Sequence, residues 1–178
     1  MKRVPVYGLM AEFDTPHDLI AAARRTHLEG YRKVDAFTPF PVEGLAEEIG
    51  FTRSGVPLVT LVGGVLGGLS GYLMQYWISA ISYPVNVGGR PYHSWPAFIV
   101  VTFEMTILFA GLAAVFGMLA LNGLPMPYHP VFNVPRFAFA SKDRFFLIIF
   151  SSDPKYEVGA TRQFVESLKP RSISEVPS

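Results

Sequence analysis

Two long apolar runs constrain the fold of this chain more than any other feature. The first, Pro57–Ile81, contains no Asp, Glu, Lys or Arg, and the second, Ala97–Leu121, contains only Glu104. Each run has 25 residues, and as a helix it would extend about 37 Å, enough to cross a hydrocarbon core of about 30 Å with some tilt. The alternative is a pair of buried soluble helices, but a chain of 178 residues is too small to enclose both. We therefore expect a transmembrane hairpin.

The distribution of basic residues predicts the orientation of this hairpin. The connecting loop, residues 82–96, carries only Arg90, whereas seven Lys or Arg precede the first run and seven follow the second. Among basic residues near the ends of the runs, Arg53 and Arg136 lie on the side of the termini and Arg90 lies on the loop side. The positive-inside rule therefore predicts cytoplasmic termini and an external loop. Aromatic residues typical of a membrane interface gather on the loop side: Trp77, Tyr83, Tyr92 and Trp95.

Composition excludes several classes of function. The chain has no cysteine, which excludes cysteine-ligated iron–sulfur clusters, covalent haem c attachment, thiolate zinc sites and disulfides. Its net charge of +1 gives no reason to expect nucleic-acid binding. The N-terminal stretch Met1–Gly8 has basic residues but no apolar run before a cleavage site, so we expect no signal peptide.

The segments that flank the hairpin each read as strand, helix and strand. Thr15 and Asp153 are expected N-caps, because each precedes a proline at the first helical position. The expected elements are Val4–Phe13, Pro16–Glu29 and Tyr31–Phe37 in the first flank, and Phe145–Ser151, Pro154–Leu168 and Ser172–Val176 in the second.

Two such units make one ferredoxin-like (split βαβ) cytoplasmic α/β domain into which the hairpin is inserted; two unrelated βαβ pieces are the alternative. The expected division is 1–56 for the first half of this domain, 57–121 for the hairpin and 122–178 for the second half. The stretch 136–143 is compatible with a strand or a short helix.

Glycines in the first run form two ridges at four-residue spacing, which let another helix backbone approach closely. The partner is either the second run of the same hairpin or a helix of another subunit. The ridge residues are Gly63, Gly67 and Gly71, with Gly64 and Gly68 beside them.

Glu104 is the only Asp, Glu, Lys or Arg within the two runs. An intramembrane charge is costly, so this side chain should face protein or water. Gln75 would lie at a similar depth in an antiparallel hairpin. We expect either a hydrogen bond between Gln75 and a neutral Glu104, or a role for Glu104 in a proton path or in pairing with a partner.

Histidines and catalytic motifs offer no cofactor site. His17, His27, His93 and His129 all lie outside the runs, so they cannot ligate an intramembrane haem. No phosphate-binding loop or catalytic triad pattern is present. We therefore expect no cofactor and no metal in this chain.

Two further segments are rich in proline and aromatic residues. Residues 39–50 read as an extended stretch followed by a short acidic helix, and residues 124–133 cannot continue a helix past their prolines. We expect both to run over a surface of another subunit, rather than over lipid headgroups or this chain's own domain.

The stretches TPFPVEGLAEEIG (38–50), SYPVNVGGRPYHSWPAF…NGLP (82–125), YHPVFN (128–133) and DRFFLIIFSSDP (143–154) resemble the ActD subunit of bacterial alternative complex III. The resemblance extends over residues 5–176, and the block from the loop into the second run is its most specific part. It implies an accessory subunit of a quinol-oxidising complex in the bacterial inner membrane. The haem c groups and iron–sulfur clusters would belong to periplasmic partner subunits, and quinol would bind polytopic membrane subunits.

The resemblance assigns no catalytic residue. It implies a periplasmic docking loop. Glu104 lies in the matching TFE segment, so it is the candidate for any role in proton movement. The residues that match the loop are Tyr83, Pro84, Asn86, Gly88, Gly89, Trp95 and Pro96.

The predicted function is therefore a cofactor-free assembly subunit of an electron-transport complex. The first alternative is a membrane-anchored ferredoxin-like module that binds a ligand as a sensor. The second is a small membrane enzyme, for which the sequence offers no paired nucleophile and base.

Overall fold

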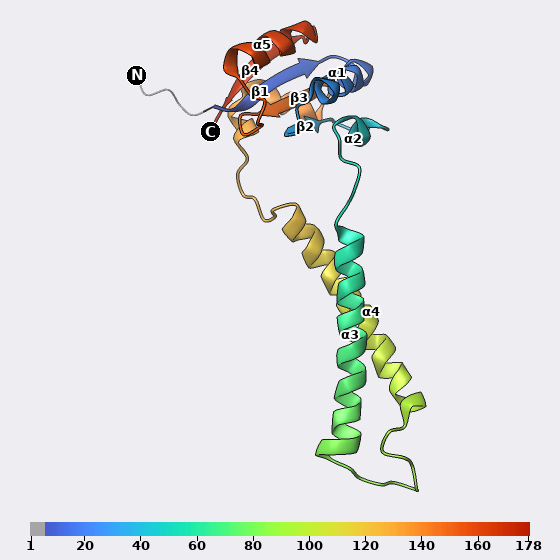
Figure 1. The fold of residues 1–178 in the computed structure, drawn as a ribbon. Helices are drawn as coiled ribbons and strands as arrows, with labels where there is room; N and C mark the ends of the chain where they lie inside the picture. Colours follow the sequence, from blue (N-terminus) through green and yellow to red (C-terminus); the bar gives the residue numbers. More distant parts are fainter. Residues whose placement is uncertain (1–5) are drawn as a thin grey trace. The chain divides into compact units, whose positions relative to one another are not determined.

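A computed structural model describes residues 6–178, so the expectations for Met1–Pro5, including the first residues of the Val4–Phe13 strand, lie outside the described residues. The chain divides into two compact units (Figure 1). The first combines Met1–Thr52 with Pro127–Ser178, and the second is Arg53–Met126. Each unit is described by itself.

The first unit contains a four-stranded antiparallel sheet with the order β2-β3-β1-β4. The chain makes strand, helix and strand twice, as the two flanks predict. The first set is β1 (Val6–Phe13), α1 (Pro16–Glu29) and β2 (Val34–Phe37); the second is β3 (Phe145–Phe150), α5 (Val158–Ser167) and β4 (Ser172–Pro177). The central strands β1 and β3 pair over six residues, for example Ala11 with Leu147.

One face of the sheet packs against α1 and α5. Alternate residues of β1 and β3, such as Ala11 and Leu147, bury their side chains against Leu19 of α1 and Val165 of α5. This alternation follows from the two-residue repeat of a strand. The short helix α2 (Leu45–Glu48) adds Leu45 to the same core and is held by a bidentate Arg24–Glu48 ion pair.

The opposite face is covered by two short 3₁₀ helices, η2 (Pro130–Asn133) and η3 (Pro135–Ser141). Val131 and Phe137 of these helices are buried against Met10 and Ile148 of the central strands. The apolar β3 sequence requires this cover, because its side chains are buried on both faces. The expectation that residues 124–133 run over another subunit is therefore wrong for residues 130–133. It is also wrong for residues 39–50 at Leu45, which is buried in this domain's own core. The ambiguous stretch 136–143 is largely η3.

A buried carboxylate fixes η3 to the sheet. Glu12 of β1 is 1% exposed, and its two oxygens accept hydrogen bonds of 2.6 Å from Nε and Nη2 of Arg136. Ser172 of β4 donates a third hydrogen bond of 2.6 Å. The hydrogen bond from Arg136 is the main reason that the pKa of Glu12 lies below its usual value, in spite of burial.

The two expected N-caps have different outcomes. Thr15 caps α1 as predicted, because its Oγ1 accepts a hydrogen bond from the Asp18 amide. Asp153 is not an N-cap, since α5 begins at Val158 after Glu157. Asp153 is instead buried and accepts backbone hydrogen bonds from Arg32 (2.7 Å), Lys33 (2.6 Å) and Lys155 (2.8 Å).

Asp153 thereby joins the two separate halves of the unit. Burial opposes ionisation of its carboxyl group, but the backbone N–H donors of Lys33, Lys155 and Arg32 outweigh burial and lower the pKa below its usual value. A carboxylate suits this position because it only accepts hydrogen bonds.

The second unit is an antiparallel pair of helices. It contains α3 (Val56–Tyr76), which continues into a π-helical segment η1 (Trp77–Ser82), and α4 (Trp95–Leu121). Val56–Ser82 and Trp95–Leu121 are each 27 residues long and apolar enough to cross a membrane. The two expected runs therefore form helices, which begin one or two residues earlier than predicted.

We predict that Asp153→Asn destabilises the α/β unit by about 2–3 kcal/mol at pH 7, because an amide cannot accept all three buried backbone hydrogen bonds. The contribution of Asp153 is complete above a pH of about 4, the ordinary pKa of the unfolded side chain, and is lost as the pH falls through the lower native pKa. The difference between the two proteins should therefore shrink in acid. Amide hydrogen exchange of β1 and β3 in the detergent-solubilised chain measures it.

Asp143→Asn is the matched control, because the Asp143 side chain is 64% exposed and its ion pair with Arg144 is long, at 3.8 Å. We expect a change of less than about 0.5 kcal/mol for this variant. Equal effects of the two substitutions would contradict the role assigned to Asp153.

Candidate functional site

The first glycine ridge of α3 lies directly against α4. A Cβ atom on Gly63 would lie 2.3 Å from the Ala113 Cβ, and one on Gly67 would lie 2.4 Å from the Met105 carbonyl oxygen. No real side chain tolerates such distances, so only glycine permits this approach of the two backbones. Gly71 is equally restricted, with its Cβ position 2.9 Å from Met105.

The second ridge lies at the border of an apolar groove on the hairpin. Gly64 is buried, with its Cβ position 3.4 Å from Ala110, and the Cβ position of Gly68 is 2.7 Å from the Thr106 Oγ1. The groove has a volume of about 510 Å³. It is lined by Thr60, Leu61, Gly64, Val65, Gly68, Leu69, Thr106 and Ala110. Both ridges therefore contact the hairpin partner, and the second also leaves an open surface.

Gln75 joins the two helices near the loop. Its Nε2 donates to the carbonyl oxygens of Gly71 (3.1 Å) and Phe98 (3.0 Å), and lies 3.4 Å from the Thr102 Oγ1. The amide therefore satisfies its donors within the hairpin.

Glu104 is not the partner of Gln75, so the expected hydrogen bond between these two side chains is wrong. Glu104 is exposed on α4, and no side chain among residues 6–178 bonds to its carboxyl group. It precedes Ala113, which faces α3, by two and a half helical turns, so the two residues lie on opposite faces of α4. The position of Glu104 along the helix is compatible with a hydrogen bond to Gln75. Its side chain, however, lies on the face of α4 that is directed away from α3.

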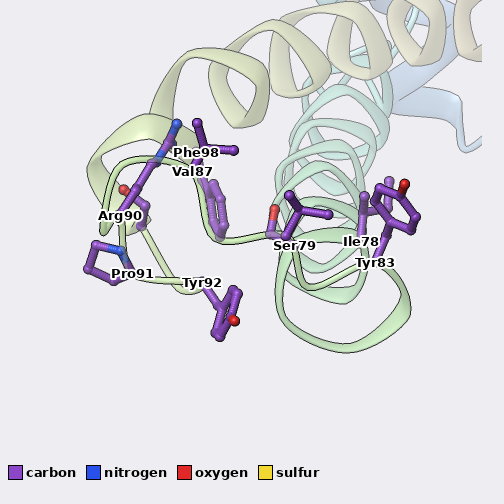
Figure 2. A pocket seen from close by; sticks show the side chains of 10 residues that line it. Ile78, Ser79, Tyr83, Val87, Arg90, Pro91, Tyr92 and Phe98 are labelled. Atoms are coloured by element: carbon purple, nitrogen blue, oxygen red, sulfur yellow. The ribbon is translucent and has the colours of Figure 1, made fainter.

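The loop between the helices surrounds a shallow pocket of about 220 Å³ (Figure 2). Figure 2 shows that its walls come from the end of the first helix (Ile78, Ser79), the loop (Arg90, Tyr92) and the start of α4 (Phe98). Serine, tyrosine and arginine side chains make this pocket partly polar, unlike the groove on the hairpin.

The expected docking residues are exposed; five of them lie in this loop, whereas Trp95 and Pro96 are the first residues of α4. Tyr83 is 74% exposed and Trp95 is 58% exposed; Pro84, Asn86, Gly88, Gly89 and Pro96 are exposed as well. The Asn86 side chain accepts a hydrogen bond of 3.0 Å from the Gly89 amide. Gly88 and Gly89 both adopt positive φ angles, +62° and +75°, which glycine takes without strain. The loop therefore has a defined turn that presents apolar side chains.

His93 is a residue whose role the sequence reasoning missed. Its Nε2 lies 2.6 Å from the Tyr72 hydroxyl, and its ring packs edge-on against Tyr72 and Tyr76. This contact attaches the loop to α3. The signal was present in the aromatic residues at the loop side of both runs, but the sequence does not show which of them contact the histidine.

The described part of the chain contains no cluster of side chains suited to bind a metal ion. Among residues 6–178, no group of three or more His, Asp or Glu side chains could hold a metal ion. The features brought together on the second unit are packing surfaces: the glycine ridges, the groove and the exposed loop.

The fold and these surfaces define a class of protein. It is a small α/β domain that carries an inserted hairpin of two helices, each long and apolar enough to cross a membrane.

Comparison with protein families assigns the chain within this class. The model of the ActD subunit of alternative complex III matches residues 7–175, and the chain belongs to this family. It is therefore a subunit of alternative complex III, which acts in electron transport, and the resemblance noted in the sequence is confirmed. A search of curated proteins finds no match.

We predict that Gly67→Ala weakens the hairpin by about 1–3 kcal/mol, because the new methyl group would overlap the Met105 carbonyl oxygen. Gly64→Ala is the matched control, since its methyl group would meet Ala110 at 3.4 Å, an ordinary contact. Thermal melting followed by far-UV circular dichroism in detergent compares the two variants. Equal melting temperatures for Gly67→Ala and Gly64→Ala would contradict the packing described.

Proposed function

We propose that this chain is an accessory subunit of alternative complex III that binds no cofactor and takes no catalytic part in the quinol:electron acceptor oxidoreductase reaction. In this proposal the two helices cross the inner membrane and pack against a polytopic quinol-binding subunit. The α/β unit, which we assign to the ferredoxin-like (split βαβ) class, braces that subunit from the cytoplasm. The haem and iron–sulfur groups belong to periplasmic partner subunits.

One observation carries the proposal: the hairpin is apolar but almost unburied. Within the most apolar windows of the two helices, only 17% and 6% of the residues are buried. A core helix of a soluble protein would be mostly buried. The apolar surface therefore requires lipid or partner helices around it. Membership in the ActD family supports the proposal, because it makes the chain one subunit of a larger complex.

The ferredoxin-like assignment rests on chain order. Two strand–helix–strand units interlock, because β3 lies between β1 and β2, and β1 lies between β3 and β4. Both helices of these units pack on the same face of the sheet. This arrangement matches a split βαβ sandwich.

The loop is the proposed docking element for periplasmic subunits. Its exposed side chains Tyr83 and Val87, together with Trp95 at the start of α4, suit a protein partner at the membrane surface. Glu104, the one Asp, Glu, Lys or Arg of the spans, is the position we propose for any contribution to a proton path. Gln75 hydrogen-bonds within the hairpin and does not connect to Glu104.

The alternative function, a membrane-anchored ligand-binding module, would use the α/β unit. A hollow of about 330 Å³ beside β2 has Arg32 and Asp35 in its wall. Burial raises the pKa of Asp35 above its usual value. A protein of this kind would purify alone, without redox partners.

The proposed function predicts the composition of a purified complex. An affinity-tagged form of the chain, extracted in mild detergent, should co-elute with polytopic subunits and with haem- and iron–sulfur-containing subunits, identified by mass spectrometry and absorption. The tagged chain separated from them should show no haem or cluster absorption. Elution of the chain alone from native membranes would favour the ligand-binding module, and an absorption band in the separated chain would overturn the cofactor-free assignment.

The orientation is tested by single cysteines, which is simple because the chain contains none. Val87 in the loop is 72% exposed, and Ser178 is the C-terminal residue. We expect a membrane-impermeant thiol reagent to label Val87→Cys in spheroplasts, and Ser178→Cys only after the membrane is opened. The reverse pattern would invert the orientation, and labelling of both from one side would contradict the two spans.

A further inference from the structure

Two features of α4 that the hairpin does not use lie on one face. Glu104 is exposed, and Gly111, which follows it by seven residues or about two turns, is exposed as well. The stripe that contacts α3, with Thr106 and Ala113, lies on the opposite side. We call the exposed side, with Val100, Glu104 and Gly111, the outer face of α4.

Glu104 requires a partner on this outer face. About 13 Å of helix separates it from the start of α4 at Trp95, and its neighbours on the same side, Val100 and Leu108, are 62% and 52% exposed apolar residues. A carboxyl group at this depth, facing only lipid, has no hydrogen-bond donor and is strongly disfavoured. The chain itself supplies none among its described residues.

Gly111 independently indicates a close neighbour. Each of the other described glycines within α3 and α4 has an atom of the paired helix within 3.4 Å of its Cβ position, whereas nothing lies within 4 Å of the Cβ position of Gly111. Gly in a helix interior costs about 1 kcal/mol relative to Ala. An outward glycine in a span is explained when another helix backbone passes at that point.

We propose that the outer face of α4 binds a transmembrane helix of a partner subunit, whose donor side chain hydrogen-bonds Glu104 and whose backbone passes close to Gly111. The two contacts are about 10 Å apart along α4, as one crossing helix can bridge. This proposal rests on the proposed function, and it adds which face of the hairpin is the interface and what chemistry the partner presents.

The hydrogen-bonding needs of Glu104 indicate what binds to the outer face of α4. Lipid tails offer no hydrogen-bond donor, and a second copy of α4 would bring a second carboxyl group to the first. A partner helix with an arginine or lysine at the depth of Glu104 satisfies the ionised carboxylate, and one with a hydroxyl or amide side chain can donate to the carboxylate or accept from the protonated form. The partner is therefore a different membrane subunit.

Retention of the tagged chain in the detergent-solubilised complex tests the proposal. We expect Glu104→Leu to reduce retention about three- to tenfold, the range that one intramembrane hydrogen bond supports, and Gly111→Leu to reduce it at least as much through steric overlap. Glu104→Gln should retain binding within about twofold, because an amide still accepts a hydrogen bond. Phe103→Leu, at a position 63% exposed on another side of α4, is the matched control and should assemble normally.

Folding and docking are separated by the isolated chain. Glu104 is exposed, and nothing lies within 4 Å of the Cβ position of Gly111. Both leucine variants should therefore melt like the unmodified chain in detergent. Normal retention of Glu104→Leu would overturn the proposal, and so would loss of retention that is matched by loss of hairpin stability. If the unmodified chain fails to co-purify with any membrane subunit, the proposed function itself fails instead.

A photoreactive amino acid in place of Leu108, beside Glu104, identifies the occupant. We expect a crosslink to a helix of a polytopic subunit that carries a donor side chain. Crosslinks only to lipid, or to a second copy of this chain, would overturn the assignment of the partner.

Discussion

The apolar and exposed surface of α3 and α4 is the constraint on which the rest of the structure depends. The two helices carry almost no charged side chains that could form ion pairs between them, so close packing and hydrogen bonds hold them together. The glycine ridge of α3 answers the first need, because Gly67 brings its backbone against the Met105 carbonyl. Gln75 answers the second through its hydrogen bond to the Phe98 carbonyl oxygen of α4.

The α/β unit solves a different problem, since its two halves are separated by the hairpin sequence. The sheet order interleaves strands from both halves, and two buried carboxylates complete the connection. Asp153 binds the backbone that precedes β2, and Glu12 binds Arg136 of η3 and Ser172 of β4. In each case a charge is buried only where enough donors surround it.

Much of this fold could be predicted from the sequence, because it depends on strong local signals. Two long runs with almost no charged residues located both apolar helices. Thr15 and the proline that follows it located the start of α1. Asp153 has the same local pattern but failed as a cap, because backbone amides from a segment about 120 residues earlier bind it. The location of η2 and η3 was missed for a similar reason: their partner is a sheet face formed by distant strands.

In the hairpin, the depth of Glu104 was readable from its place in the run, but its direction depends on which side of α4 faces the glycines. The helical phase of the small residues Thr106, Ala110 and Ala113 was sufficient to predict that Glu104 points outward. His93 could not be assigned in this way, because its contact with Tyr72 depends on the path of a loop.

The interleaved strand order has a consequence for synthesis of the protein. β1 and β2 are both made before the hairpin, yet they are not neighbours in the sheet, because β3 lies between them. The first 52 residues can therefore form no sheet of their own and emerge from the ribosome as an unfinished half. The hairpin is therefore synthesised while this half is still open, and the α/β unit closes only when the C-terminal residues arrive.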